Sequence, residues 1–318
     1  MKNFAMIGAA GYIAPRHMRA IKETNNNLIA ALDKSDSVGI IDSYFPEASF
    51  FTEFERFDRY IDKAKRKGTN VDYVSIMSPN YLHDSHIRFA LRINAHAICE
   101  KPLVVNPWNL EALEELEKES DKNIFNILQL RLHPSIIALK EKIDNELVKN
   151  PDKIYDVDLT YLTSRGRWYF SSWKGEEKKS GGIVANIGVH FFDMLSWVFG
   201  DRRETKVHRI ESDSAGGVLD LKHARVRWFL GLRYDLIPGE VKETGARTYR
   251  SITVDGDEVE FSDGFTDLHT VSYQRILDGK GFRLSDAFPS INLVHSIRSS
   301  EISSLTGDYH PLLKEIDK

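Results

Sequence analysis

The sequence predicts an α/β N-terminal domain built on a parallel sheet, followed by an α+β C-terminal domain with an open-faced, mostly antiparallel sheet. In the first half of the chain, short apolar strands alternate with helical segments, which is the pattern of successive βαβ units. In the second half, strands follow one another with few helices between them, which favours antiparallel pairing. We place the domains at residues 1–130 and 131–318. Whether the C-terminal residues pack back on the first domain is left open.

The composition is that of a soluble globular chain and argues against several kinds of partner. Of the 318 residues, 42% are hydrophobic and 28% are charged, which suits two domains. The net charge of −4 argues against nucleic-acid and membrane partners, because both require a concentrated basic face. Cys99 is the single cysteine, so the chain can form neither an internal disulfide nor a cysteine-based metal cluster, and we predict no metal site. We find no export signal and no apolar run of membrane-spanning length, and we expect a cytoplasmic protein.

The first strand, Phe4–Ile7, runs directly into a glycine-rich turn that opens a helix over residues 16–24. Gly8 permits the tight turn, Gly11 lets backbone amides approach a pyrophosphate, and the small Ala14 allows the helix to pack closely on the strand. This spacing is a variant of the dinucleotide-binding fingerprint, and a plain strand-to-helix turn accounts for it about as well. The residues of the turn that we assign to a cofactor are Gly8, Gly11, Tyr12 and Ile13.

The second strand, Leu28–Leu32, ends at Asp33, where a carboxylate can hydrogen-bond the ribose of an adenosine. Because an acid at this position repels a 2′-phosphate, Asp33 favours NAD over NADP. Asp36 is a rival for the same role, and an aspartate that only begins a loop is the structural alternative. The predicted cofactor is NAD.

Two later strands also end in polar residues. Val71–Met77 leads into a polar stretch that begins at Ser78, and Ala95–Cys99 leads into Glu-Lys-Pro at residues 100–102. In a parallel sheet these ends meet at the edge where open α/β sheets bind ligands. A solvated strand end explains an isolated Glu-Lys pair, but the convergence with the glycine turn favours a functional site. The residues of these two stretches that we expect at this edge are Ser78, Pro79, Asn80, His83, Glu100 and Lys101.

The last strand expected in the first domain is Asn123–Gln129, after a helix over about 107–120. Gln129 suits an amide contact to the cofactor or a sugar, and Arg131 suits a bidentate contact to a carboxylate or phosphate. A surface cap is the alternative for either residue.

The glycine turn, the stretch 78–83 and the Glu-Lys-Pro sequence together resemble the family of glucose-fructose oxidoreductases and inositol dehydrogenases (Gfo/Idh/MocA). The resemblance implies a Rossmann domain that binds NAD(P), followed by an open-faced sheet that binds a sugar. It also implies that Lys101 is the active-site lysine and that Pro79 and Glu100 flank the nicotinamide and its ribose. On this resemblance we assign the six strand-end residues named above to the cofactor. The family's usual Gly-x-Gly-x-x-Gly is stretched by one residue here.

The C-terminal domain begins with a strand over Lys153–Ser164, whose alternating apolar residues indicate one wet and one covered face. Asp255 and Gly256 predict a hairpin turn. The later strands are expected at Val207–Ser212, Val218–Lys222, Ala224–Leu236 and Arg247–Phe261.

A helix is expected within residues 180–199, with Asn186 and His190 stacked on one face and Asp193 one turn further on, where a carboxylate can orient the imidazole. A lone helical histidine is more often structural than catalytic. The segment resembles the family's second signature, Gly-Gly-x-x-x-Asp-x-x-x-His, with Asn186 in place of the aspartate. Because an amide takes no proton, the base would be Lys101 or His190, with Asn186 binding a hydroxyl.

Cations and aromatic rings gather in residues 163–173 and suit a lining for sugars and anionic groups. Residues 164–169 of this stretch, together with 172–175, 186–190 and 248–254, resemble the bacterial UDP-N-acetylglucosaminuronate 3-dehydrogenases. Such enzymes oxidise a C3 hydroxyl to a ketone on the route to diacetamido uronic acids of surface polysaccharides, and some reoxidise bound NADH with 2-oxoglutarate. The residues assigned to the UDP-sugar substrate are Lys101, Arg131, Tyr161, Arg165, Tyr169, Trp173, Asn186 and His190.

Two other functions stay open, an oxidoreductase of a free sugar or inositol and a non-catalytic sensor of NAD or a sugar nucleotide. For assembly we expect a homo-oligomer, a dimer or a tetramer, because an uncovered apolar sheet face must be buried on something. The residues expected to form that face are Val226, Trp228, Leu230 and Leu232.

Overall fold

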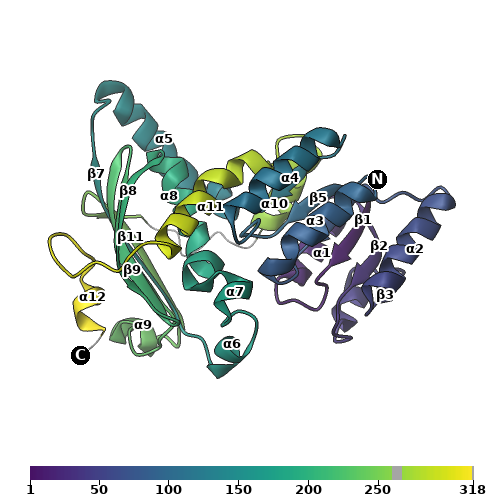
Figure 1. The fold of residues 1–318 in the computed structure, drawn as a ribbon, viewed down its shortest axis with the longest axis horizontal. Helices are drawn as coiled ribbons and strands as arrows, with labels where there is room; N and C mark the ends of the chain where they lie inside the picture. Colours follow the sequence, from purple (N-terminus) through teal and green to yellow (C-terminus); the bar gives the residue numbers. More distant parts are fainter. Residues whose placement is uncertain (260–266, 317–318) are drawn as a thin grey trace. The chain divides into compact units, whose positions relative to one another are not determined.

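The computed structural model describes residues 1–259 and 267–316, and the chain divides into two compact units (Figure 1). The first unit contains Met1–Gln129 and also helix α10, Leu268–Leu277, with the chain that follows it to Phe288. The second unit contains the described residues from Leu130 to Val259 and those from Pro289 onward. The first unit is therefore discontinuous in sequence, and α10 packs beside helix α1 within it.

A six-stranded parallel sheet forms the centre of the first unit, with the strand order β3-β2-β1-β4-β5-β6. This is the doubly wound order of Rossmann folds, in which the chain changes direction between β1 and β4 and leaves a binding crevice at the strand ends. The strands are β1 Asn3–Ile7, β2 Asn27–Leu32, β3 Ser49–Phe51, β4 Tyr73–Ile76, β5 His96–Cys99 and β6 Ile124–Asn126. The helical segments are α1 Ala14–Glu23, η1 Gly39–Ser43, α2 Phe54–Arg66, η2 Asn80–Leu82, α3 His83–Arg92 and α4 Pro107–Glu119.

The predicted α/β order of this unit is confirmed, and one strand differs from the prediction. The strand expected to continue to Gln129 ends at Asn126, and Gln129 begins the 3-10 turn η3, Gln129–Leu132. The side chain of Asn126 donates to the carbonyl of Cys99 at 3.0 Å, and the amide of Leu128 donates back to Asn126 at 3.1 Å. The backbone therefore turns at Asn126, which an apolar run alone does not indicate.

A second six-stranded sheet, ordered β12-β11-β7-β10-β9-β8, forms the centre of the second unit. All neighbouring strands pair antiparallel except β7 and β10, which are parallel, so the sheet is mixed and mostly antiparallel as expected. The strands are β7 Tyr155–Thr163, β8 Arg202–Ile210, β9 Ser214–Leu221, β10 Ala224–Gly231, β11 Thr248–Val254 and β12 Asp257–Glu258. The helical segments are α5 Pro134–Lys149, α6 Arg167–Ser171, α7 Glu177–Ser180, η4 Val184–Gly188, α8 Val189–Phe199, α9 Gly239–Glu243 and α12 Leu312–Glu315; α11, Leu284–Arg298, begins in the first unit and ends in the second.

The predicted hairpin is present, because Asp255 and Gly256 have φ of 51° and 88° and join β11 to β12. The part of the predicted last strand that reaches Phe261 lies outside the described residues. Strands β8 and β9 begin earlier than predicted, at Arg202 and Ser214. Their first residues are mostly charged in β8 and small in β9, so no apolar alternation marked these strand starts in the sequence.

The apolar stripe of β10 is covered within the chain. This contradicts the prediction that an uncovered apolar sheet face requires a partner subunit. Val226, Trp228 and Leu230 are each 0% exposed, and Leu232 is 2% exposed. The ring of Trp228 meets that of Phe192 on α8 edge to face, with centroids 5.2 Å apart. The unit's own helix therefore buries this face.

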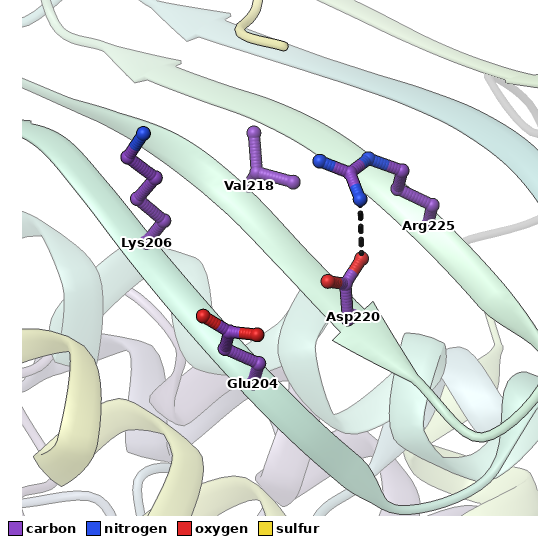
Figure 2. Close-up of a pocket in the computed structure, with 5 residues that line it drawn as sticks. All are labelled: Glu204, Lys206, Val218, Asp220 and Arg225. Atoms are coloured by element: carbon purple, nitrogen blue, oxygen red, sulfur yellow. Dashed lines mark ion pairs between the residues drawn. The ribbon is translucent and has the colours of Figure 1, made fainter. Parts of the chain in front are cut away.

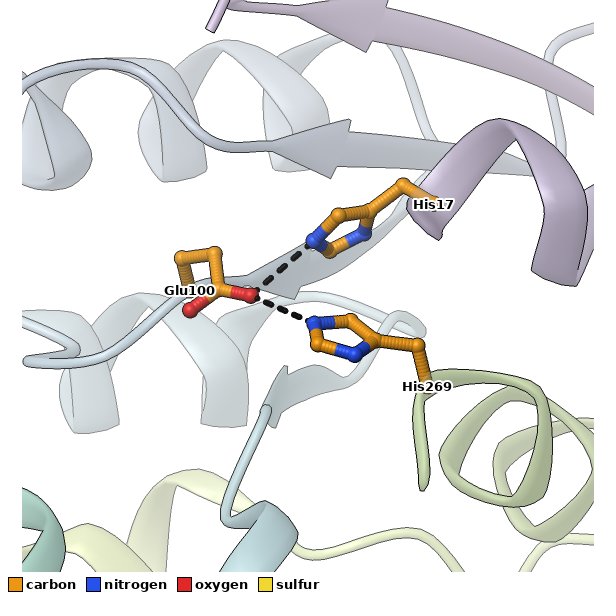
Figure 3. A group of neighbouring side chains, drawn as sticks. All are labelled: His17, Glu100 and His269. Carbon is orange, nitrogen blue, oxygen red and sulfur yellow. Dashed lines mark hydrogen bonds and ion pairs between the residues drawn. The ribbon is translucent and has the colours of Figure 1, made fainter. Parts of the chain in front are cut away.

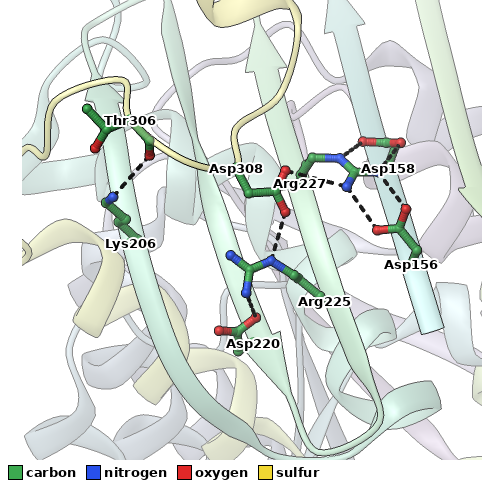
Figure 4. Close-up of polar contacts among 8 residues, drawn as sticks. All are labelled: Asp156, Asp158, Lys206, Asp220, Arg225, Arg227, Thr306 and Asp308. Carbon is green, nitrogen blue, oxygen red and sulfur yellow. Dashed lines mark hydrogen bonds and ion pairs between the residues drawn. The ribbon is translucent and has the colours of Figure 1, made fainter. Parts of the chain in front are cut away.

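The opposite face of the second sheet carries a ladder of ion pairs (Figure 4). Arg227 on β10 donates to Asp158 at 2.6 Å and to Asp156 at 2.9 Å, both on β7, and Arg225 donates to Asp308 at 2.7 Å. Beyond Arg225, a polar hollow of about 130 Å³ is lined by Glu204, Lys206, Val218, Asp220 and Arg225 (Figure 2). None of the predicted site residues lies in this hollow.

One helical stretch among the described residues, Glu177–Phe199, is long and apolar enough to cross a membrane by length and composition. Of its most apolar window, 78% is buried inside the fold, which identifies it as a core helix.

Candidate functional site

The glycine turn after β1 has the shape that a dinucleotide requires. Gly8 has φ of +97°, and a Cβ at this position would lie 2.6 Å from the carbonyl carbon of Met77, so only glycine fits. The amide of Gly11 donates to the carbonyl of Gly8 at 3.1 Å and closes the turn. The amides of Tyr12 and Ile13, just before α1, make no hydrogen bond to any described residue. Two free amides at a helix N-terminus fit a pyrophosphate.

Asp33 lies at the end of β2 and is held against this turn. Its Oδ2 accepts from the amide of Ala10 at 2.9 Å, and its Oδ1 accepts from the amide of Ser35 at 2.9 Å. The structure therefore places a carboxylate beside the pyrophosphate cradle, which is the arrangement that a ribose hydroxyl requires.

His83 is the predicted cofactor residue that the structure places elsewhere. Its side chain is 0% exposed, and its Nδ1 and Nε2 lie 2.8 Å from the carbonyls of Pro102 and Ser78, respectively. Because both ring nitrogens face backbone oxygens, His83 ties two strand-end loops together and has no atom left for a cofactor. Its neighbour His86, which sequence reasoning missed, lies 2.8 Å from the hydroxyl of Ser78 through Nδ1.

Glu100 lies at the end of β5 in a buried cluster with two histidines, His17 of α1 and His269 of α10 (Figure 3). Its Oε1 lies 3.0 Å from the Nε2 of each imidazole, and its Oε2 accepts from the amide of Lys101 at 3.2 Å. Burial alone would raise the pKa of Glu100, but the hydrogen bonds of the two histidines hold that pKa well below its ordinary value. We call these three residues the Glu100 cluster.

Sequence reasoning missed His17 and His269, and no local signal would have found the second. His269 is 169 positions from Glu100 in sequence and belongs to a helix after the second sheet. His17 lies in the first turn of α1 and could have been noticed as a histidine facing the sheet beside the glycine turn.

Buried histidines predict a loss of stability at mildly acidic pH. Burial lowers the pKa of His86 to about 4 and that of His310, in the second unit, also to about 4. In the unfolded chain each takes up a proton below about pH 6.5, whereas the folded sites resist it. The contribution of the two histidines to the free energy of unfolding is therefore complete above pH 6.5 and is lost as the pH falls toward 4. The loss is at most about 3 kcal/mol for each histidine.

We expect the melting temperature, followed by circular dichroism, to fall steadily from pH 7 to 4.5. His310→Gln should flatten part of this slope. A melting temperature constant over that range would contradict the prediction.

In the second unit, Arg131 and Asp193 form a buried bidentate pair. The Nε and Nη2 of Arg131 donate to the two carboxylate oxygens at 2.9 and 2.7 Å, and both side chains are at most 6% exposed. The fork that was predicted to hold a substrate carboxylate or phosphate is thus engaged by Asp193. A substrate contact from Arg131 would compete with this pair, and the geometry favours a structural role in joining the start of the unit to α8.

Asn186 and Tyr169, two predicted substrate residues, are brought together. The Nδ2 of Asn186 donates to the hydroxyl of Tyr169 at 2.9 Å. The expected continuous α-helix is wrong at this point, because Val184–Gly188 forms a turn of π-helix before α8 begins. Such turns insert one residue into a helix and often occur at functional sites. His190 follows in the first turn of α8 and is half-buried.

Of the other predicted substrate residues, Tyr161, Arg165 and Trp173 belong to the second unit, whereas Lys101 belongs to the first. Tyr161 on β7 packs its ring 4.7 Å from that of Phe191. Arg165 is exposed, and Lys174 lies 4.5 Å from the ring centre of Trp173. Burial, and then the charge of Arg165, lower the pKa of Lys174. These cations and rings are suited to an anionic sugar.

Two family models match the chain. One, described as an oxidoreductase family with an NAD-binding Rossmann fold, matches residues 2–127, and its C-terminal alpha/beta domain matches residues 140–235. Among solved structures, the WlbA (WbpB) dehydrogenase from Thermus thermophilus is 48% identical and covers 98% of this chain and 100% of its own. The TM-score is 0.94 for its complex with NAD and alpha-ketoglutarate and 0.93 for its complex with NAD and UDP-GlcNAcA.

Curated relatives are more distant. Glucose-6-phosphate 3-dehydrogenase from Bacillus subtilis is 25% identical over 207 residues, which are 63% of this chain and 54% of that protein. D-glucoside 3-dehydrogenase from Escherichia coli is 25% identical over 198 residues, 62% of this chain and 53% of that protein. The chain thus spans about half the length of these curated relatives.

A doubly wound parallel sheet with a glycine cradle, followed by a mixed sheet that carries polar and aromatic side chains, defines a nicotinamide-dependent oxidoreductase. The chain belongs to the Gfo/Idh/MocA oxidoreductase family, as the sequence predicted.

Proposed function

We propose that this protein is an NAD-dependent dehydrogenase that oxidises the C3 hydroxyl of UDP-GlcNAcA, UDP-N-acetylglucosaminuronate, to a ketone. The observation that carries the proposal is the 48% identity over 98% of the chain to the Thermus thermophilus dehydrogenase bound to NAD and UDP-GlcNAcA. The product would serve the synthesis of diacetamido uronic acids for surface polysaccharide. We place this reaction in the cytoplasm, which cell fractionation would test.

The reaction removes a hydride from C3 and a proton from the hydroxyl on that carbon. NAD, when bound, accepts the hydride at its nicotinamide. We assign the proton to His190 as general base, with the Lys101 ammonium stabilising the developing alkoxide and Asn186 binding a hydroxyl. The two main roles can be exchanged, because a lysine at a strand end can lose its proton when desolvated. Arg165 and Trp173 are proposed to contact the sugar nucleotide.

Oxidation of a simpler sugar is the second candidate, favoured by the two curated 3-dehydrogenases of glucose-6-phosphate and glucosides. A non-catalytic sensor of NAD or sugar nucleotide is the third. Purified protein should be mixed with NAD and, separately, UDP-GlcNAcA, glucose-6-phosphate or myo-inositol, while absorbance of reduced nicotinamide is followed.

Repeating each reaction with 2-oxoglutarate tests whether bound NADH is reoxidised in place, as the alpha-ketoglutarate complex of the Thermus protein suggests. Turnover of UDP-GlcNAcA alone supports the proposal. Turnover of only an unactivated sugar supports the second candidate, and ligand binding without turnover supports the third.

Asp33→Ala is expected to weaken NAD binding and to relax discrimination against NADP, because the carboxylate beside Ala10 both binds the ribose and repels a 2′-phosphate. Calorimetry should show roughly a tenfold loss of NAD affinity, about 1.4 kcal/mol. Asp36→Ala is the matched control and should bind NAD normally. Tighter binding of NADP than NAD to the unmodified protein would contradict the cofactor assignment.

A homo-oligomer, dimer or tetramer, stays a prediction that now rests on the family resemblance, since the apolar stripe of β10 is covered internally. Light scattering at micromolar concentration measures it directly. If the ion-pair face of the second sheet forms the contact, the assembly should weaken at high salt. A monomer at low and high salt would end the prediction.

A further inference from the structure

We propose that His17 and His269 are positioning residues for the proposed dehydrogenase reaction, holding Glu100 as a carboxylate that fixes the backbone of Lys101. The inference rests on the proposed function for its kinetic test. It concerns residues that the proposed mechanism leaves unused.

The hydrogen bonds of the Glu100 cluster fix the protons on both rings. Because an ionised carboxylate accepts only, the Nε2 of His17 and of His269 must each carry a proton and donate to Oε1. The Nδ1 of His17 lies 2.8 Å from the hydroxyl of Tyr273, which lies 2.7 Å from that of Ser75. With His17 neutral, Tyr273 donates to Nδ1 and Ser75 donates to Tyr273. The chain of four hydrogen bonds is then completely matched.

The second ring reaches the cluster from a distant part of the sequence and is equally constrained. His269 is 2% exposed, and its Nδ1 has no hydrogen-bond partner among the described residues. A proton on this nitrogen would make the ring a charged imidazolium with a buried N–H and no acceptor, which costs more than a bare nitrogen on a neutral ring. His269 is therefore also neutral, with its single proton directed at Glu100.

Lys101 is held by this arrangement on its N-terminal side and by His83 on its C-terminal side. Glu100 accepts from the amide of Lys101 at 3.2 Å, and His83 binds the carbonyl of Pro102 at 2.8 Å. Histidines from α1, α3 and α10 thus anchor the residues on both sides of the predicted active-site lysine. Precise placement of such a group is worth a large factor in rate.

A metal ion is the rival explanation, since the three ligand atoms lie within 4.8 Å of one another. The two Nε2 to Oε1 distances of 3.0 Å are ordinary hydrogen bonds and account for every donor without a cation. Arg16 acts electrostatically on His17, and Glu100 interacts electrostatically with the titratable groups of His83, Cys99 and Tyr273. Lys101 contacts Glu100 through its backbone amide, and its charge acts on His83.

The kinetic test compares His269→Leu with His269→Gln, whose amide can still donate toward Glu100. We expect His269→Leu to lower kcat about tenfold or more while the KM for UDP-GlcNAcA and the Kd for NAD stay within about threefold. With one donor lost, the pKa of Glu100 rises, so any acidic limb of the kcat profile should move to higher pH. His269→Gln should recover most of the rate, and Thr270→Ala, one residue along α10, should behave as wild type.

A second measurement is independent of activity. Nitrogen-15 NMR of labelled histidines in the whole protein should show His17 and His269 as neutral Nε2–H tautomers at pH 7, and Glu100→Gln should change both signals. Failure of the unmodified protein to oxidise UDP-GlcNAcA would refute the proposed function and leave this measurement intact. Stoichiometric metal by mass spectrometry, an imidazolium at either ring, or a folded His269→Leu with unchanged kcat and pH profile would overturn the inference.

Discussion

Replacing Lys101 with methionine is expected to lower turnover of UDP-GlcNAcA by roughly 10² to 10⁴, the range for loss of a positioned acid, base or charge-stabilising group. Methionine keeps the length of the side chain and removes the ammonium. NAD should still bind, because the glycine turn and Asp33 are untouched, and this can be measured by fluorescence titration. Stopped-flow absorbance of reduced nicotinamide gives the rate of the first turnover.

His190→Asn separates the two roles that the proposal leaves interchangeable. If His190 is the general base, the variant should lose turnover to a similar extent and should lose the limb of the pH profile that reports its ionisation. Near-full turnover from pH 6 to 9 would make the histidine structural and leave Lys101 as the base. A Lys101→Met protein with normal turnover would refute the catalytic assignment of the lysine.

Asp193→Ala is expected to destabilise the second unit by about 3 to 5 kcal/mol, because it removes the carboxylate that forms the bidentate pair with the buried guanidinium of Arg131. Urea unfolding followed by tryptophan fluorescence measures the change, since Trp197 and Trp228 both belong to this unit.

Two controls accompany this experiment. Asp220→Ala removes a partner of the exposed Arg225 and should change stability by less than about 1 kcal/mol. The double change Arg131→Met with Asp193→Leu removes both charges and should recover much of the loss. If the free energy of unfolding of Asp193→Ala lies within about 1 kcal/mol of that of the unmodified protein, the pair contributes little to stability.

Local patterns predicted the first unit well. Apolar strands that end in glycine, aspartate or a Glu-Lys-Pro sequence are properties of a few neighbouring residues, and parallel pairing then brings their ends to one edge of the sheet. The strand that ends at Asn126 shows the limit, because a side-chain hydrogen bond to Cys99 decides where the chain turns.

Contacts between distant segments could not be predicted from the sequence. The sequence alone suggested that the Arg131 guanidinium is available to a ligand. In the structure, its Nε and Nη2 both donate to Asp193, which lies 62 positions later in the chain. The sequence alone likewise presented Glu100 as an acid at a strand end, whereas in the structure helix α10 places His269 in hydrogen-bond contact with it. The apolar alternation along β10 was seen, but it cannot tell whether a partner subunit or the unit's own α8 covers it.

The discontinuous first unit has a consequence for synthesis on the ribosome. When the residues up to Gln129 have emerged, the parallel sheet is complete, but helix α10 and its histidine have not yet been made. Glu100 therefore gains its second histidine donor, and α1 its neighbouring helix, only after the whole second sheet has been synthesised. A fragment that stops at Gln129 would expose the surface of α1 that α10 covers, whereas a late-arriving α10 can dock only after the intervening strands have left the exit tunnel.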